Sequence, residues 1–262
     1  MDIGVKDKVA IVTGGSEGIG RAAAERLSAE GAKVALVSRT QADLDRVAAE
    51  ISGATGNEVI GVATDVRDES ACEAMVNTVV AAWGRVDILV NNAGTSSAAR
   101  FEDMTNDQFD DDFTLKVKGA IFCTRYALPY LQQQGGAICN TTTPGGKAPG
   151  RASQPTAMSR AAGISLTKTW ANEFAAAGVR VNTVCVGFLR SRQHERRFEK
   201  AHTENPDLTL DEHYAVFNSM IPMGRVGDAS EAGDVIAFLC SDGARYVTGT
   251  AVNVDGGMSP VV

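Results

Sequence analysis

The sequence predicts an α/β fold in which a parallel sheet is covered by helices on both faces. Short runs of β-branched and other apolar residues alternate with longer amphipathic stretches along the whole chain. Strict alternation of strand and helix implies right-handed crossovers and parallel strands. The strand segments are apolar at nearly every position, as in a sheet that is buried on both faces. A glycine-rich turn follows the first strand.

The expected elements follow this pattern. The predicted strands are short and rich in apolar residues: Val9–Val12, Lys33–Ser38, Val59–Ala63, Val86–Val90, Ala137–Thr141, Val179–Val184 and Ala251–Val254. The predicted helices between them have an apolar face: Ile19–Glu30, Ala42–Ile51, Glu69–Trp83, Gln108–Leu131, Ala157–Ala177 and Glu231–Cys240. Because no linker or internal repeat divides the chain, we expect one domain over residues 1–262. A long polar stretch at about 190–223 follows a strand, where such folds bind ligands, and is expected to be a substrate lid.

Composition limits the classes of function. A net charge of -7 and a pI of about 5.1 argue against nucleic-acid and anionic-membrane partners, so we expect a small-molecule substrate. The five cysteines lack metal-site or disulfide spacing, which predicts no metal site, a reducing compartment and core positions. The first strand begins close to Met1 and no apolar run is long enough to span a membrane, so a cytoplasmic location is expected.

The glycine-rich turn runs from Thr13 to Gly20, directly into a predicted helix. Glycines allow a tight turn and a close approach to a pyrophosphate, and the helix N-terminus offers N–H donors to the anion. In this position the motif predicts a Rossmann-type dinucleotide site. The second strand then ends in Ser38 and Arg39, where an enzyme that prefers NAD usually carries an acid. A hydroxyl and a guanidinium suit a 2′-phosphate, which favours NADP(H) over NAD(H). A simple surface role for Arg39 is the alternative, and Glu17 would repel a phosphate.

Several further motifs occur in order along the chain. Asp65 and Val66 follow the third strand, and the segments 91–94, 246–249 and 254–257 read Asn-Asn-Ala-Gly, Tyr-Val-Thr-Gly and Val-Asp-Gly-Gly. With the glycine turn, they resemble the short-chain dehydrogenase/reductase family over essentially the whole chain. The resemblance implies a doubly wound, seven-stranded Rossmann sheet and a homotetramer or homodimer packed through the helices that begin near Gln108 and Ala157. The cofactor residues implied by the loop and the resemblance are Gly14, Ser16, Glu17, Gly18, Ile19, Gly20, Ser38, Arg39, Asp65, Val66, Asn92, Ala93, Gly94, Arg160, Gly187 and Ser191.

The family's catalytic residues are replaced. Matching the motifs residue by residue puts Lys116 at the family's Asn, Thr143 at its Ser, Thr156 at its Tyr and Arg160 at its Lys. A threonine hydroxyl is a far weaker acid than a phenol, and an arginine keeps its proton, so the usual proton relay is in doubt. The segment from 140 to 163 is also similar to the enoyl-CoA reductase branches of the family.

Two classes of function stay open. One is a hydride transfer to a conjugated C=C, whose enolate needs hydrogen-bond donors more than a strong acid, or to a carbonyl. The other is a catalytically silent dinucleotide-binding protein. Thr143 is either a hydrogen-bond donor to the substrate or only a β-branched residue at the end of a strand. Thr156 is either such a donor or the N-cap of the following helix, and these two roles are compatible. Lys116 is either an acid whose pKa Arg160 lowers or a solvent-facing side chain.

The expected lid is rich in charge. Its cations either clamp an anionic substrate tail or form a solvated helical face with neighbouring glutamates. Tyr214 is the best remote candidate for a replacement acid, with His194, His202 and His213 as competitors. The cationic residues in question are Arg190, Arg192, His194, Arg196, Arg197 and Lys200.

Overall fold

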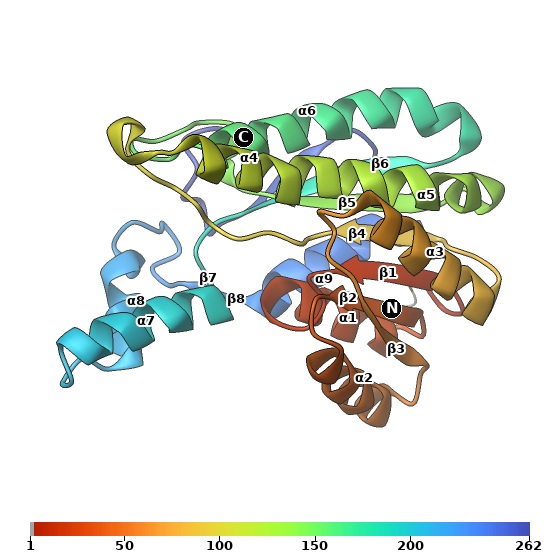
Figure 1. Cartoon of the computed structure of the whole chain (residues 1–262), viewed down its shortest axis with the longest axis horizontal. Helices are drawn as coiled ribbons and strands as arrows, with labels where there is room; N and C mark the ends of the chain where they lie inside the picture. Colours follow the sequence, from red (N-terminus) through yellow and green to blue (C-terminus); the bar gives the residue numbers. More distant parts are fainter. Residues whose placement is uncertain (1–2) are drawn as a thin grey trace.

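A seven-stranded parallel sheet forms the centre of the molecule, as predicted (Figure 1). The computed structural model describes residues 3–262, except for the side chains of residues 192–194, 196, 197 and 200. The strand order is β3-β2-β1-β4-β5-β6-β9, and every pair is parallel. The strands are β1 Val9–Thr13, β2 Lys33–Ser38, β3 Val59–Ala63, β4 Ile88–Asn91, β5 Ala137–Thr142, β6 Arg180–Val186 and β9 Ala251–Val254. Their bounds agree with the predicted strands to within two residues.

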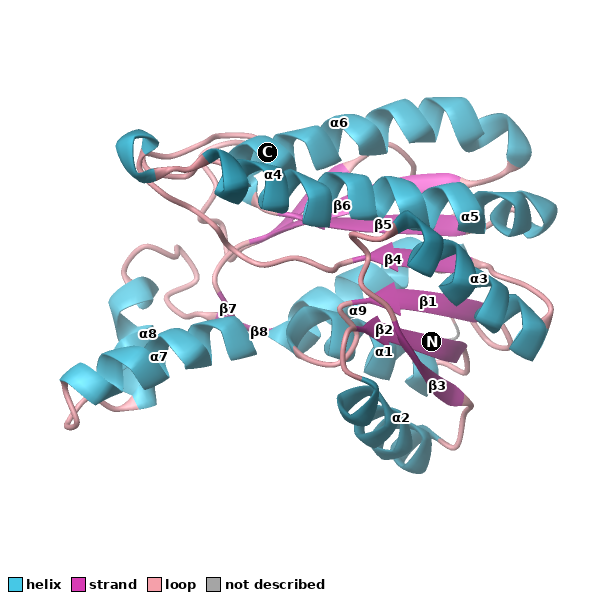
Figure 2. Ribbon diagram, in the orientation of Figure 1, coloured by secondary structure: helices cyan, strands magenta, loops and turns pink. Residues whose placement is uncertain are grey.

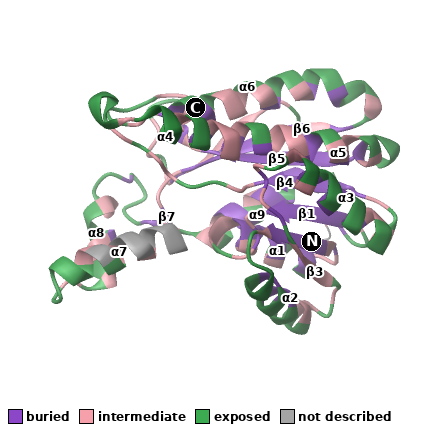
Figure 3. Cartoon of the chain, viewed as in Figure 1, coloured by how far each residue is buried: buried purple, intermediate pink, exposed green. Residues whose placement is uncertain are grey.

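Helices cover both faces of the sheet (Figure 2). On one face pack α1 Gly18–Ala29, α2 Gln41–Thr55 and α9 Ala229–Cys240. On the other pack α3 Glu69–Trp83, α5 Gly119–Gln134 and α6 Thr156–Phe174. Each face therefore has its own apolar core, and the inner strands β1, β2, β4, β5 and β6 are largely buried between them, whereas the edge strands β3 and β9 are only partly buried (Figure 3). All five cysteines are free and buried, as predicted.

The predicted helix from Gln108 to Leu131 is interrupted. It consists of α4 Asn106–Phe113, the π-helical turn η2 Thr114–Lys118, and α5. A π turn adds a residue to the helical repeat and often occurs at functional sites. Here it changes the phase between the two helices at the point where Lys116 enters the interior.

The stretch after β6 forms a separate small unit. It contains α7 Arg192–Glu204 and α8 Leu210–Asn218, which extend away from the sheet in Figure 1. The short parallel strands β7 Leu189–Arg190 and β8 Gly227–Asp228 join its two ends. Its own core is formed by Tyr214, Ile221 and Val226. Four 3-10 turns complete the described elements: η1 Phe101–Asp103, η3 Pro144–Gly146, η4 Ala175–Ala177 and η5 Asp242–Ala244.

The contact between α1 and α9 gives a test of the packing. A Cβ added at Gly233 of α9 would lie 2.8 Å from the backbone of Ala22, whereas one added at Gly53 of α2 would meet no atom within 4 Å. We expect Gly233→Ala to lower the free energy of unfolding by about 1–3 kcal/mol through overpacking. The control Gly53→Ala should raise it by about 0.5–1 kcal/mol through helix propensity. Urea unfolding measures both, and equal effects of the two substitutions would contradict this packing.

Candidate active site

A cavity of about 640 Å³ lies at the carboxyl edge of the sheet. Residues that follow β1 through β6 line it, because all parallel strands end at this edge. Of the residues expected to hold a cofactor, only Gly20 is absent from its described lining. The others are Gly14, Ser16, Glu17, Gly18, Ile19, Ser38, Arg39, Asp65, Val66, Asn92, Ala93, Gly94, Arg160, Gly187 and Ser191.

The glycine turn takes a shape that side chains would prevent. Gly14 has φ +65° and Gly18 has φ +57°, both in the left-handed region. A Cβ at Gly20 would lie 2.2 Å from the carbonyl oxygen of Gly14, so this glycine serves the packing of α1 against the turn. Glu17 precedes α1 without a side-chain hydrogen bond that caps the helix. The first-turn N–H groups of α1 therefore keep their capacity to bind an anion.

Hydrogen bonds join the loops after β1 and β4. The hydroxyl of Thr13 accepts from the backbone N–H groups of Asn92 and Ala93, at 2.9 and 3.0 Å. In return, the side-chain amide of Asn92 donates to the carbonyl oxygen of Thr13 at 3.0 Å. These contacts hold the segment 92–94 beside the glycine turn, along one wall of the cavity.

Charged groups gather where β2 and β3 end. Arg39 is exposed at the cavity, and Asp65 binds the guanidinium of Arg67 at 3.1 Å. Burial acts to raise the pKa of Asp65, but the hydrogen bonds from Arg67 and the charge of Arg39 hold it below its usual value. This end of the cavity therefore presents two cations and one ionised carboxylate at neutral pH.

Arg160 crosses the floor of the cavity from the second turn of α6. Its Nη1 donates to the carbonyl oxygen of Thr141 at 2.7 Å, and a Cβ at Gly94 would lie 2.9 Å from its Nη2. Burial lowers the pKa of Arg160 to about 10, and the charge of Asp112 acts in the opposite direction. Arg160 is therefore a fixed positive charge at neutral pH.

Lys116 is buried, so of the two alternatives left open for it, the solvent-facing side chain is wrong. Only 2% of its side chain is exposed, and its Nζ forms an ion pair with the fully buried Asp112. Desolvation and the nearby charge of Arg160 lower the pKa of Lys116 to about 8, despite the opposing effect of Asp112. The amine thus titrates within reach of neutral pH, which the ordinary lysine value does not allow.

Thr156 links this buried pair to the cavity. Its Oγ1 accepts from the backbone N–H of Ser97 at 3.0 Å and from Lys116 Nζ at 3.3 Å. Thr156 also lines the large cavity, as does Thr143. The expectation that Thr156 caps the helix is wrong, because Thr156 is the first residue of α6 and no side-chain hydrogen bond caps this helix.

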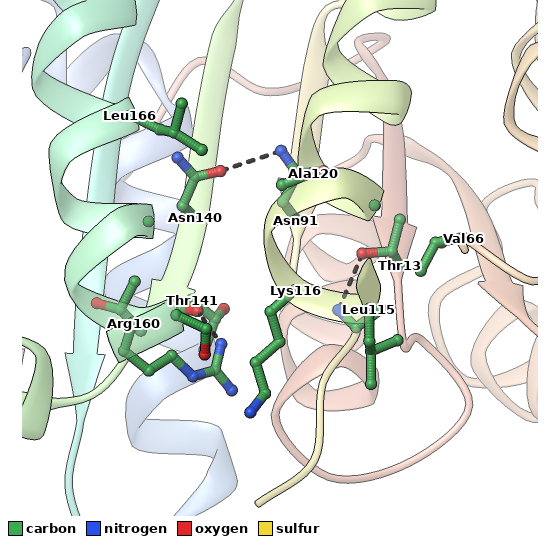
Figure 4. A pocket seen from close by; sticks show the side chains of 15 residues that line it. Thr13, Val66, Asn91, Leu115, Lys116, Ala120, Asn140, Thr141, Arg160 and Leu166 are labelled. Carbon is green, nitrogen blue, oxygen red and sulfur yellow. Dashed lines mark hydrogen bonds between the residues drawn. The ribbon is translucent and has the colours of Figure 1, made fainter. Parts of the chain in front are cut away.

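A second, much smaller cavity of about 20 Å³ adjoins the first and shares Thr141 and Arg160 with it (Figure 4). Figure 4 shows the Lys116 and Arg160 side chains converging at one end of it, and Asn91 and Asn140 paired at the other. Three of its lining residues carry buried polar atoms with no hydrogen-bond partner among the described residues: Asn91 Oδ1, Thr141 Oγ1 and Arg160 Nε. Its size and polarity suit a single water molecule.

The described residues of the expected lid that were candidates for a replacement acid do not line the large cavity. Tyr214 is buried in the core of the α7–α8 unit beneath Arg190 at 4.8 Å, and burial raises its pKa. Neither Tyr214 nor His202 nor His213 is among the described residues that line the cavity. The side chain of His194 lies outside the described residues, as do those of Arg192, Arg196, Arg197 and Lys200.

Asp112, Ser97 and Ser159 belong to the site although no sequence motif pointed to them. Asp112 precedes Lys116 by four residues, a spacing that pairs side chains on a helix. That signal was present, but the same spacing occurs in exposed pairs such as Arg46 with Glu50.

Among the described residues, no helix is both long and apolar enough to cross a bilayer. No group of histidine, cysteine, aspartate and glutamate residues in this part of the chain could hold a metal ion.

The chain is similar to proteins of known class over nearly its whole length. A family model described as Enoyl-(Acyl carrier protein) reductase matches residues 14–259. The 3-oxoacyl-[acyl-carrier-protein] reductase of Thermotoga maritima is 34% identical, over 97% of this chain and 98% of that protein. The meso-2,3-butanediol dehydrogenase of Serratia marcescens is 33% identical, over 96% and 94%.

Solved structures agree. L-sorbose reductase of Gluconobacter frateurii, solved with NADPH and L-sorbose, is 31% identical with a TM-score of 0.96, over 100% of both chains. An NADPH-bound short-chain oxidoreductase of Pseudomonas aeruginosa PAO1, described as containing an atypical catalytic center, is 32% identical with a TM-score of 0.91, over 98% and 100%. From these matches and the glycine-turn cavity, the chain belongs to the short-chain dehydrogenase/reductase family of NAD(P)-dependent oxidoreductases.

Proposed function

We propose that the chain is an NADP(H)-dependent reductase of a carbonyl substrate, with threonine and arginine in place of the family's tyrosine and lysine. One observation carries this proposal: the same cavity is lined by the glycine turn and the other expected cofactor residues, which we call the dinucleotide cradle, and by Thr143 and Thr156. Arg160 also lines this cavity. The relatives named as 3-oxoacyl, sorbose and levodione reductases support a carbonyl substrate.

The cradle fits a dinucleotide. The left-handed glycines leave room for a close approach of backbone to pyrophosphate, and the N-terminus of α1 supplies N–H donors. Ser38 and Arg39 would receive a 2′-phosphate, Asp65 and Val66 the adenine, and Asn92 to Gly94 the adenosine ribose. Gly187, Ser191 and Arg160 would hold the nicotinamide end. When bound, the reduced cofactor supplies the hydride.

The chain's own residues then stabilise the substrate oxygen. Thr156 Oγ1 accepts from the N–H of Ser97 and from Lys116 Nζ, and it donates its own hydrogen to Asp112 Oδ1 over a long 3.5 Å contact, which a substrate oxygen in the cavity would replace. Thr143 offers a second hydroxyl, and the permanent charge of Arg160 favours negative charge on that oxygen. An enolate oxygen from a conjugated C=C would be held by the same groups. This enoyl alternative is supported by the description of the matching family model.

The segment 190–223 is proposed to form the lid of this site. Leu189 and Ser191 line the cavity, and the α7–α8 unit that follows them is joined to the rest of the fold through β7 and β8. We propose in addition that the protein assembles as a homotetramer or homodimer through α4, α5 and α6, as the family resemblance implies.

The cofactor preference can be tested at Arg39. We expect Arg39→Ala to weaken NADPH binding about 10- to 100-fold, because a charged hydrogen bond to phosphate contributes about 1.5–3 kcal/mol. NADH binding should change little. Fluorescence titration with both dinucleotides measures this, with Arg46→Ala on α2 as the control for loss of a surface cation. Equal weakening for both dinucleotides would show that Arg39 does not recognise the 2′-phosphate.

The substrate class can be tested by NADPH consumption with paired thioesters of equal chain length, one 3-keto and one 2-enoyl, together with a ketose. Oxidation of NADPH with the keto compound or the ketose supports carbonyl reduction. Oxidation of NADPH with the enoyl thioester alone would instead support reduction of a conjugated C=C through an enolate. Demonstrable NADPH binding without turnover of any of them would contradict the reductase proposal and favour a silent dinucleotide-binding protein.

The role of the Thr156 hydroxyl can be tested by Thr156→Val, which keeps the shape and removes the donor. We expect kcat to fall about 100-fold or more, as for loss of a proton-transfer group, with the Kd for NADPH unchanged. Thr156→Ser, which restores the hydroxyl, should recover most of the loss. A valine variant with the wild-type kcat would exclude the hydroxyl from the reaction.

A further inference from the structure

The most unusual feature of this site is a charged cluster built behind Thr156. The carboxylate of Asp112 is fully buried and forms the ion pair with Lys116. It also accepts from Ser159 Oγ at 2.6 Å and, more weakly, from Thr156 Oγ1 at 3.5 Å. Three elements, α4, η2 and α6, contribute to the cluster. A buried ion pair costs desolvation, so it contributes little to stability by itself and invites a functional explanation.

The cluster has a defined connection to the substrate cavity. Lys116 lines the small cavity, whereas Thr156 lines the large one. Lys116 Nζ contacts Thr156 Oγ1 at 3.3 Å, so the hydroxyl bridges the buried amine and the large cavity. The N–H of Ser97 holds this hydroxyl in place from the other side.

Resting on the proposed function, we propose that Lys116 is the proton source of the reaction, acting through Thr156, and that Asp112 is the positioning residue that holds Lys116. As the hydride adds to the carbonyl carbon, the substrate oxygen takes the Thr156 hydroxyl proton, and Thr156 Oγ1 takes one from Lys116 Nζ. The O–H bond of Thr156 and one N–H bond of Lys116 break, and two new O–H bonds form. Lys116 is left as a neutral amine and regains its proton from water that enters the cavity after product release.

The electrostatics of the cluster suit this role. The charged groups that face Lys116 are Asp112 from α4 and Arg160 from α6. Desolvation and Arg160 disfavour the ammonium form, and Asp112 favours it, which leaves a pKa of about 8. Lys116 is then protonated at pH 7 and yields its proton more readily than an ordinary lysine does. A threonine hydroxyl, too weak an acid by itself, needs only to pass a proton on.

A pH profile tests the relay. Reduction needs the ammonium form, so kcat should be constant at low pH and fall as the pH rises through about 8. Oxidation of the alcohol needs the neutral amine and should rise over the same range. Asp112→Asn removes the charge that favours the ammonium, so the inflection should move down by about 1–3 pH units. Lys118→Met, an exposed lysine of the same π turn, should leave the profile unchanged.

A second measurement on the wild-type protein does not depend on activity or on the folding of a variant. In a protein with isotope-labelled lysines, the NMR signal that is absent from Lys116→Met should titrate near pH 8. A titration midpoint near the ordinary lysine pKa would overturn the relay. The relay would also be overturned if Asp112→Asn did not move the inflection in the pH dependence of kcat. A purely structural Asp112 would lower the melting temperature and the active fraction without moving the inflection. Absence of turnover with every substrate would overturn the proposed function and the relay together, whereas turnover with an unshifted profile overturns the relay alone.

Discussion

All seven strands of the central sheet run in the same direction, and the placement of the site depends on this constraint. The loops that follow β1 to β6 must emerge at one edge, however far apart they lie in the sequence. Thr13 and Asn92 illustrate the consequence, since residues 79 positions apart exchange hydrogen bonds that hold two cavity walls together. Burial of the strands between two apolar layers gives that edge its rigidity. Polar groups at the edge are therefore held in place by a scaffold that takes no part in the chemistry.

Behind the edge, the chain places three charges close together in the interior. Lys116, Asp112 and Arg160 come from η2, α4 and α6, and their sum is one positive charge. Such an arrangement is costly unless each group has partners, and Ser159 and the carbonyl oxygen of Thr141 provide two of them. The π turn at Thr114–Lys118 accompanies the inward direction of Lys116, because the added residue shifts the helical phase at that position.

This arrangement changes how the family's reaction is to be understood in this chain. A phenol beside a lysine provides an acid in one side chain, whereas a threonine cannot. In the proposed reaction the tasks are divided: Thr156 contacts the cavity, Arg160 supplies a fixed positive charge, and Lys116, with its pKa lowered to about 8, is the proton source. The proposed chemistry thus stays within acid–base catalysis, with the acid placed one hydrogen bond further from the substrate.

By itself, the sequence determined the α/β class, the strands to within a few residues and the position of the glycine turn. These features depend on local periodicity and on the backbone freedom of glycine, which are properties of short segments. The sequence also brought Lys116, Thr143, Thr156 and Arg160 together as candidates through motif order. Only the tertiary structure decided that Lys116 is buried, because its pairing with Asp112 has the same spacing as an exposed helical pair. It also decided that Thr156 binds the N–H of Ser97, 59 residues away, instead of capping its helix. Contacts of that kind depend on how the elements pack, and no local pattern encodes them.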